Sequence, residues 1–244
     1  MYVLGVAQND IPIKIYLDSA SSQDIFKFYS NAQIPVSGFT TNPSLMKSAG
    51  VTNYLSFVEE VTKKIPDLPI SFEVLSDDLI EMKRQALKLS SIAPNVYVKI
   101  PVVNTKNQST AKIVGELNKD GVKLNITAIF SKSQVLEHLD RIENKTDIVF
   151  SVFAGRISDT GVNAMNVVSE IKSLCESYSN VQLLWASTRE LYNIVQAIES
   201  GCNIITITSP ILEKMTLLNK NLIDYSLETV KMFLDDAESS GYSF

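Results

Sequence analysis

Eight short apolar segments recur along this 244-residue chain, and longer helical patterns separate them. They are expected as β-strands at 13–18, 36–39, 69–74, 96–100, 123–127, 147–152, 181–186 and 203–207. Their spacing averages roughly 27 residues, which is the length of one strand-plus-helix unit. Several of the segments are almost continuously apolar, as expected for parallel strands that are covered on both faces.

The intervening segments repeat apolar residues at i, i+3, i+4 and i+7, which is typical of amphipathic helices. They are expected at 22–31, 53–64, 77–92, 108–120, 131–144, 163–178, 188–201 and 209–220, with a ninth helix at about 225–239. The alternation predicts an α/β fold, a (β/α)8 TIM barrel in one domain over residues 1–244, with the ninth helix added at the C-terminus. A doubly wound open sheet is the alternative, but it usually has fewer strands, and no GxGxxG follows the first strand.

The composition and net charge indicate which kinds of ligand or partner the chain is suited to bind. The chain is 45% hydrophobic and 20% charged, which is typical of a globular protein with a large core. Its net charge is −5 and no basic stretch stands out, which argues against nucleic acid but leaves room for an anionic small molecule. The first ten residues lack the positive region of a signal peptide, and no apolar run approaches a membrane span, so we expect a cytoplasmic protein that binds no membrane.

Cysteine and histidine are scarce. Cys175 and Cys202 are far apart without a CxxC motif, and they are expected to be reduced and buried. The single histidine, His138, falls in an amphipathic helical pattern and is expected on the helix surface. Such a chain has few ligands for a zinc site and no second histidine for acid–base chemistry. Carboxylates, lysine, tyrosine or water must then carry any proton transfer.

Lys99 interrupts an otherwise buried strand, VYVKIP at 96–101. Alternation along the strand places Val96, Val98 and Ile100 on one face, against the helices, and Tyr97 with Lys99 on the other, inside the barrel. Burying a lysine amine costs several kcal/mol unless it is paired or neutralised. Lys99 is therefore either a surface residue whose amine reaches water or an interior residue with a chemical role.

Polar residues follow most of the predicted strands at the carboxyl end, where the active sites of such barrels lie. They are Asp18, Thr41, Asn42, Glu73, Lys99, Asn125, Thr127, Ser151, Ser187 and Arg189, with Arg156 just beyond the sixth strand. Each also has an ordinary structural explanation, such as a helix cap, a turn, a satisfied core polar group or a solvated charge. An interior amine beside carboxylates would nevertheless suit one reaction. A neutral amine attacks a carbonyl to form an iminium, and a carboxylate takes a proton from the departing side.

The segments YLDSA, GFTTNPSL, SFEV, VYVKIPV, NITAIFS, FAGRI, ASTRE and GCNIITI resemble the transaldolase family, which includes small transaldolases and fructose 6-phosphate aldolases. They run in the family's order from residue 13 to about 208. The resemblance implies a (β/α)8 barrel, a Schiff-base mechanism that uses no metal and no organic cofactor, sugar-phosphate substrates and a homo-oligomer.

The resemblance also implies roles for individual residues. Lys99 would form the iminium, and Asp18 would be the acid–base group for the carbon–carbon bond. Glu73 and Thr127 would hold the water that carries protons. Asn42, Asn125 and Ser151 would bind the dihydroxyacetone part, whereas Arg156, Arg189 and Ser187 would hold the substrate phosphate.

The chain departs from the family at a few positions. The common SPFVGR is SVFAGR here, with Val152 and Ala154, and the usual HP-containing segment after the last strand is absent. In the aldolase branch a tyrosine and a glutamine stand where this chain has Phe153 and Glu73. The two residues favour a transaldolase, with a fructose 6-phosphate aldolase or a non-catalytic sugar-phosphate-binding barrel as alternatives.

Overall fold

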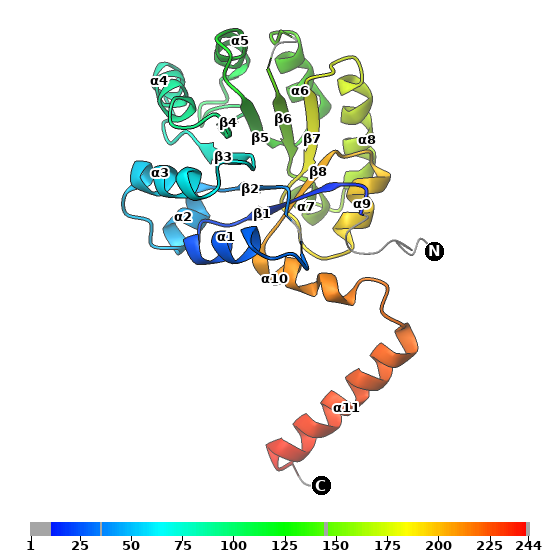
Figure 1. The fold of residues 1–244 in the computed structure, drawn as a ribbon. Helices are drawn as coiled ribbons and strands as arrows, with labels where there is room; N and C mark the ends of the chain where they lie inside the picture. The colour runs from blue at the N-terminus through cyan, green and yellow to red at the C-terminus, as the bar shows by residue number, and fades with distance from the viewer. Residues whose placement is uncertain (1–10, 35, 144–145, 243–244) are drawn as a thin grey trace.

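A computed structural model describes residues 11–34, 36–143 and 146–242. The expectation drawn from the first ten residues lies outside this range. Eight parallel strands close into a barrel in chain order, and helices surround it (Figure 1). The strands are β1 (Lys14–Asp18), β2 (Gly38–Thr40), β3 (Ile70–Glu73), β4 (Val96–Pro101), β5 (Leu124–Ile129), β6 (Ile148–Val152), β7 (Val181–Trp185) and β8 (Ile204–Ile207). The predicted (β/α)8 barrel is confirmed.

A helix follows each strand, as the periodicity predicts, and two short helices that it did not predict, at Pro43–Ser48 and Ala154–Asp159, follow β2 and β6. The helices are α1 (Ser22–Tyr29), α2 (Pro43–Ser48), α3 (Tyr54–Lys64), α4 (Leu79–Ser90), α5 (Ala111–Lys119), α6 (Lys132–Leu139), α7 (Ala154–Asp159), α8 (Ala164–Cys175), α9 (Asn193–Glu199), α10 (Ser209–Leu212) and α11 (Leu222–Ser240). A short 3-10 helix at Glu213–Leu217 follows α10. Side-chain oxygens of Ser21, Asn53 and Asp78 accept hydrogen bonds from the first turns of α1, α3 and α4, which fixes where these helices begin.

Several boundaries differ from the sequence prediction. The helix predicted at 209–220 is the short α10 followed by the 3-10 helix at Glu213–Leu217. β2 begins at Gly38 rather than at residue 36. β5 continues to Ile129, past a register shift next to Ala128, whose φ is 58°. α9 begins at Asn193 rather than near residue 188, because the Asn193 side chain accepts hydrogen bonds from the backbone of Arg189 and Glu190. The segment before α9 is therefore a loop.

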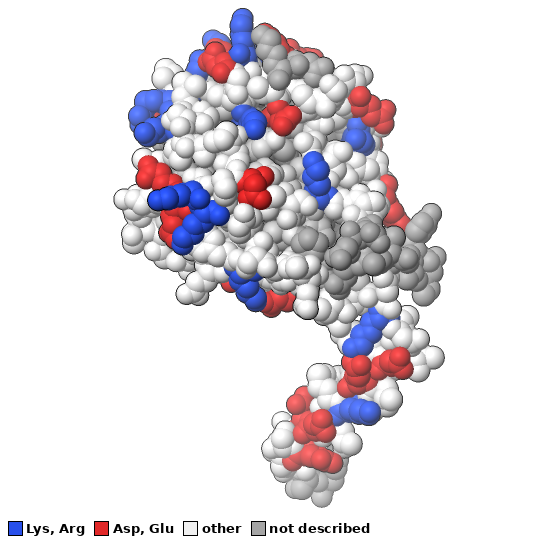
Figure 2. Space-filling model, in the orientation of Figure 1, with Lys and Arg blue, Asp and Glu red and all other residues white. Residues whose placement is uncertain are grey.

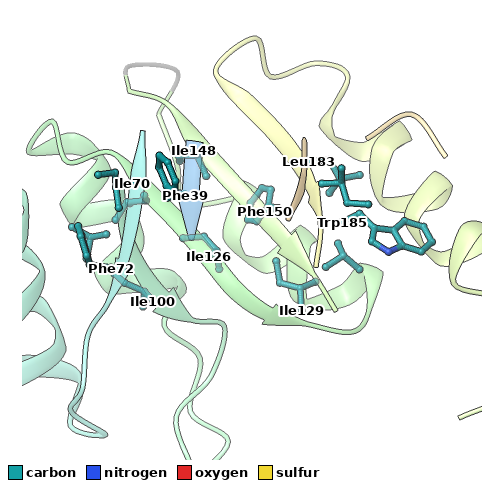
Figure 3. Close-up of a cluster of buried hydrophobic side chains, with 14 of the residues drawn as sticks. Phe39, Ile70, Phe72, Ile100, Ile126, Ile129, Ile148, Phe150, Leu183 and Trp185 are labelled. Atoms are coloured by element: carbon teal, nitrogen blue, oxygen red, sulfur yellow. The ribbon is translucent and has the colours of Figure 1, made fainter. Parts of the chain in front are cut away.

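The main core lies between the barrel and its helices. Outward-facing strand residues form it, including Phe39, Ile70, Phe72, Ile100, Ile126, Phe150, Leu183 and Trp185 (Figure 3). A second, smaller cluster fills the barrel interior, with Tyr16, Val149, Leu184, Ala186 and Ile204 packed against Tyr97 and Phe153. The alternation predicted for the fourth strand is thus observed, because Val98 belongs to the outer core and Tyr97 to the interior cluster.

His138 does not lie on the surface, so that expectation was wrong. Its side chain is fully buried, with Nε2 3.2 Å from Thr110 Oγ1 and Nδ1 2.8 Å from the carbonyl oxygen of Gln134. Burial lowers the pKa of His138 and favours the neutral ring. The two cysteines are buried and free, as expected, and burial raises their pKa values to about 11 for Cys175 and about 12 for Cys202.

The last helix, α11, projects away from the barrel (Figure 1), and none of its residues is buried. It starts three residues earlier than predicted and ends at Ser240, followed by the C-cap residue Gly241, whose φ is 68°. Figure 2 shows Lys and Arg interspersed with Asp and Glu over the visible face, α11 included. Within the described residues, no helix is both long and apolar enough to cross a membrane.

Candidate active site

A cavity of about 480 Å³ opens at the carboxyl ends of the strands. Of the residues predicted from the sequence, it is lined by Asp18, Asn42, Glu73, Lys99, Thr127, Phe153, Arg156, Ser187 and Arg189. Asn125 and Ser151 are buried and do not line it. The fold therefore brings together side chains that are up to 171 positions apart in the sequence (18 to 189).

Lys99 lies on the wall of this cavity with 6% of its surface exposed. Its Nζ donates a hydrogen bond to the carbonyl oxygen of Thr41 at 2.7 Å and lies 3.2 Å from Glu73 Oε2. Glu73 is its direct neighbour because β3 and β4 pair these two residues in register. Tyr54 holds the end of β3 from outside, since its hydroxyl donates to the Glu73 carbonyl oxygen at 2.5 Å. The amine is thus paired, and it points into the barrel as the alternation predicts.

Asp18 supplies a second carboxylate to the same cavity. The Thr40 hydroxyl donates to Asp18 Oδ1 at 2.7 Å, and Thr40 Oγ1 also lies 2.6 Å from Thr206 Oγ1. Burial raises the pKa of Asp18, whereas the charge of Lys99 and the hydrogen bond from Thr40 oppose the rise. Neither threonine was among the candidates from the sequence. The period-2 pattern could have identified Thr206, which shares a face with the interior residue Ile204.

Asn125 and Thr127 of β5 and Ser151 of β6 lie at different distances from the cavity. Ser151 Oγ donates to Asn125 Oδ1 at 2.7 Å, and Asn125 Nδ2 donates to Ser71 Oγ at 3.0 Å, so these groups satisfy one another below the cavity. Thr127 lies higher and lines the cavity. Its Oγ1 is buried and has no hydrogen-bond partner among the described residues. Such an orphaned hydroxyl at a cavity wall is suited to binding a water molecule or a substrate hydroxyl.

The two arginines reach the cavity from α7 and from the loop before α9. The Arg156 guanidinium lies 5.4 Å from the centre of the Phe153 ring. Arg189 contacts Asp159 through two hydrogen bonds, Nε to Oδ1 at 3.2 Å and Nη2 to Oδ2 at 2.5 Å. This contact lowers the pKa of Asp159, a residue of α7 that the sequence patterns did not indicate. The Nε and Nη2 donors of the Arg189 guanidinium are therefore already bonded to Asp159.

A glycine allows α7 to approach the end of β7. A Cβ atom at Gly155 would lie 1.7 Å from the carbonyl oxygen of Ser187, which no side chain could tolerate. Ser187 itself has a φ of 65°, in the left-handed region, where residues other than glycine are uncommon. Gly155 of the GRI segment is thus required for a close backbone contact, and that contact places Arg156 next to the loop that carries Arg189.

Asn42 lines the cavity from the loop after β2. Its Oδ1 accepts a hydrogen bond from the backbone of Leu45 at 3.0 Å, which caps the short helix α2 and fixes the Asn42 side chain. In the part of the chain that the structure describes, no group of three or more His, Cys, Asp or Glu side chains is placed to hold a metal ion. The functional groups at this end of the barrel are therefore an amine, two carboxylates, hydroxyls, an amide and two guanidinium groups.

Comparison with known proteins agrees with these observations. A family described as transaldolase/fructose-6-phosphate aldolase matches residues 15–243. A "Probable transaldolase" of Dehalococcoides mccartyi is 33% identical over 204 residues, covering 83% of this chain and 90% of that protein. Another, from Methanococcus maripaludis strain C7, is 34% identical over 229 residues, covering 93% and 98%.

Among solved structures, a deoxyribose phosphate aldolase from Aeropyrum pernix has a similar fold. The TM-score is 0.58 at 12% identity, with 87% of this chain and 93% of that chain covered. At this identity the likeness concerns the barrel alone. The match over nearly the whole length and the identity to several relatives place this chain in the transaldolase/fructose-6-phosphate aldolase family.

Proposed function

We propose that this chain is a cytoplasmic transaldolase of the pentose phosphate pathway. It would take a dihydroxyacetone unit from a ketose phosphate, such as sedoheptulose 7-phosphate or fructose 6-phosphate, and transfer it to an aldose phosphate. The observation that carries the proposal is the buried Lys99 amine, which lines a cavity with two carboxylates and two arginines. Membership of the family supports it.

The first half of the proposed reaction forms the Schiff base. Glu73, 3.2 Å from Lys99 Nζ, accepts a proton from the ammonium group. The neutral amine then attacks the ketone carbon, and the carbonyl oxygen leaves as water to give an iminium. Thr127, with its unpaired hydroxyl at the cavity wall, holds the water that relays protons together with Glu73.

The second half breaks and remakes a carbon–carbon bond. The Asp18 carboxylate takes the proton from the C4 hydroxyl, the C3–C4 bond breaks, and its electron pair moves into the iminium to form an enamine. The aldose departs, and the enamine carbon attacks the acceptor aldehyde. Asp18 returns its proton to the new alkoxide, and water releases the product ketose from Lys99.

The remaining residues would hold the substrate. We assign the phosphate to Arg156, Arg189 and Ser187, because all three line the cavity and α7 contacts the loop after β7 at Gly155 and Ser187. Guanidinium groups bind phosphate through paired hydrogen bonds. We assign the dihydroxyacetone contact to Asn42, which lines the cavity, and a supporting role from below to Asn125 and Ser151.

Covalent trapping tests this proposal. Borohydride reduction with fructose 6-phosphate should fix a sugar adduct on Lys99, located by mass spectrometry of the digested protein. Lys99→Met should abolish the adduct. Lys14→Met is the matched control, because Lys14 lies at the opposite end of β1, where it donates to Gln182, and the adduct should persist in that variant. An adduct on another lysine, or none on the unmodified protein, would refute the mechanism.

We further propose a homo-oligomer in which a second copy of the chain covers α11. Ile223, Leu227, Val230 and Leu234 repeat at intervals of four and three residues, and 54–80% of each side chain is exposed. That spacing is typical of a helix seam that packs on another helix. Sedimentation should show Leu227→Asp with Val230→Asp dissociating the assembly and the control Glu238→Gln leaving it intact. A monomer in the unmodified protein would contradict the proposal.

A further inference from the structure

Thr206 is a hydroxyl residue in a strand that otherwise consists of isoleucine. β8 reads Ile204, Ile205, Thr206 and Ile207. Thr206 is 5% exposed, faces the barrel interior as Ile204 does, and reaches the cavity wall. A buried hydroxyl must find a hydrogen-bond partner to offset its desolvation.

That partner lies on the far side of β1. β1 pairs with β2 on one side and with β8 on the other. Thr40 of β2 and Thr206 of β8 nevertheless meet inside the barrel, with their Oγ1 atoms 2.6 Å apart. Thr40 Oγ1 is also 2.7 Å from Asp18 Oδ1, so three strands contribute to one line of hydrogen bonds that ends at the Asp18 carboxylate.

When Asp18 is ionised, the number of hydroxyl protons available determines which group donates in each of these two hydrogen bonds. A hydroxyl carries one proton, and an ionised carboxylate carries none. The Thr40 proton must then point to Asp18 Oδ1, and the contact between the two threonines requires the Thr206 proton to point to Thr40. Hydrogen bonds in such a chain polarise one another, which strengthens the one that reaches the charge.

We propose that Thr206 is a positioning residue for proton transfer at Asp18: by donating to Thr40, it keeps the Thr40 proton on Oδ1 and leaves Oδ2 to exchange protons with the substrate. The inference rests on the proposed function, in which Asp18 is the acid–base group. Among the described residues, Thr40 is the only hydrogen-bond donor to the Asp18 carboxylate. The orientation of the carboxylate therefore depends on this line.

The charged surroundings of Asp18 are the same with and without Thr206. Glu73 and Lys99 line the cavity from β3 and β4, and Arg156 and Arg189 line it from α7 and the loop before α9. β2 and β8, the strands that flank β1, carry no titratable side chain. A substitution at Thr206 thus changes the hydrogen bonding of Asp18 without changing a charge near it.

The test compares Thr206→Val, which removes the hydroxyl and suits a strand, with Thr206→Ser, which keeps it. The Asp18 carboxyl carbon is titrated by NMR in labelled protein, with Asp18→Asn identifying its signal. The pKa of Asp18 should rise in Thr206→Val and return to that of the unmodified protein in Thr206→Ser. The kcat value should fall about 3- to 10-fold in Thr206→Val with little change in KM.

A double variant distinguishes an effect transmitted through Thr40 from a general disruption of the barrel interior. Because Thr206 acts through Thr40, Thr40→Val with Thr206→Val should lose no more activity than Thr40→Val alone. An unchanged Asp18 titration in Thr206→Val, or losses that multiply in the double variant, would overturn the inference. Failure of the proposed function would look different, since no adduct would form on Lys99, and the NMR titration would still decide whether Thr206 acts on Asp18.

Discussion

The barrel interior contains two layers of side chains from the same strands, and the layers differ in chemistry. The lower layer is largely apolar and contains Tyr16, Tyr97, Val149, Leu184 and Ile204. The upper layer, two residues further along each of four of these strands, contains Asp18, Lys99, Ser151 and Thr206. A step of two residues keeps the side chain on the interior face, so only its distance from the cavity changes.

The difference indicates a division between stability and chemistry. The lower layer fills the barrel with side chains that need few partners, and burying them stabilises the fold. The upper layer buries an amine, a carboxylate and hydroxyls, whose desolvation opposes folding unless hydrogen bonds offset it. If this is correct, substitutions in the two layers should have opposite effects on stability and activity.

The largest contrast should come from Lys99→Met and Leu184→Ala. Lys99→Met should lower kcat about 10⁴-fold or more, because it removes the proposed nucleophile. Leu184 is fully buried, and Leu184→Ala should lower the free energy of unfolding by about 2–5 kcal/mol while the folded enzyme remains active. Urea unfolding and a coupled assay measure both quantities.

A double variant sharpens this contrast. Lys99→Met alone leaves the Glu73 carboxylate without its partner at 3.2 Å. Lys99→Met with Glu73→Gln removes both charges, and the free energy of unfolding should rise by about 1–2 kcal/mol, as it does when other buried ion pairs are replaced. If the double variant is less stable than the unmodified protein, the upper layer contributes to stability and the proposed division is wrong.

The arginines at the cavity rim should affect substrate choice more than either layer does. A guanidinium–phosphate contact in a partly desolvated site should contribute roughly 2–4 kcal/mol, or about 30- to 1000-fold in kcat/KM. Arg189→Ala or Arg156→Ala should therefore impair phosphorylated ketoses far more than dihydroxyacetone as donor. Asp159→Ala should have a smaller effect, because the half-exposed Arg189–Asp159 pair is well solvated. Equal losses on both kinds of donor would assign these arginines to the fold.

The sequence predicted the upper layer best where the pattern within a single strand was sufficient to place a residue. Alternation in VYVKIP placed Lys99 inside the barrel without knowledge of any neighbour. Asp159 could not be found in this way, because its partner Arg189 is 30 residues away and the two meet only where Gly155 lets α7 approach the Ser187 backbone. Local periodicity contains no information on such a contact.

His138 illustrates the same limit in the outer core. Its helix shows the expected apolar positions Val135 and Leu139, and His138 lies between them on the edge of the buried stripe. Whether such an edge residue faces water depends on the next helix, and here Thr110 at the start of α5 reaches the ring. The late start of α9 depends similarly on the Asn193 side chain, which accepts hydrogen bonds from the backbone of the preceding loop at Arg189 and Glu190, and periodicity does not reveal such contacts.

The choice between transfer and hydrolysis should depend on Phe153, which follows β6 two residues beyond Ser151 of the upper layer. Phe153 packs against Phe130, with ring centres 5.8 Å apart, and lines the cavity without offering a hydrogen bond. A water beside the enamine is then poorly held, so we expect slow release of dihydroxyacetone from fructose 6-phosphate alone and rapid turnover with erythrose 4-phosphate. Phe153→Tyr should raise the hydrolytic share about 2- to 10-fold, since a hydroxyl can hold that water.

The same assay can contradict the expectation that transfer is faster than hydrolysis. If the unmodified protein cleaves fructose 6-phosphate equally fast with and without erythrose 4-phosphate, the chain is an aldolase that releases dihydroxyacetone. Phe153→Leu is a suitable control, because it keeps an apolar side chain at this position and should not raise the hydrolytic share.

The smallest expected effect concerns stability and pH at Asp18. Burial raises the pKa of Asp18 in the folded protein above its value in the unfolded chain, which is about 3.9 for a free aspartate. The folded state therefore binds this proton more tightly than the unfolded state does. The contribution of Asp18 to stability is fully present below the unfolded pKa and is lost as pH rises through the folded pKa.

Asp18→Asn tests the sign of this linkage. The amide oxygen can still accept the hydrogen bond from Thr40, and Lys99 keeps Glu73 as its partner, so the main change is the loss of a buried charge. The variant should be more stable than the unmodified protein at pH 7, and the gain should shrink towards pH 4, where Asp18 becomes protonated. Thermal unfolding at both pH values measures this, with Asp236→Asn on the exposed α11 as a control that should change little. A gain that stays constant or grows at acidic pH would mean that Asp18 is not held in a setting that favours its protonated form, and that the upper layer tolerates this charge as well as water does.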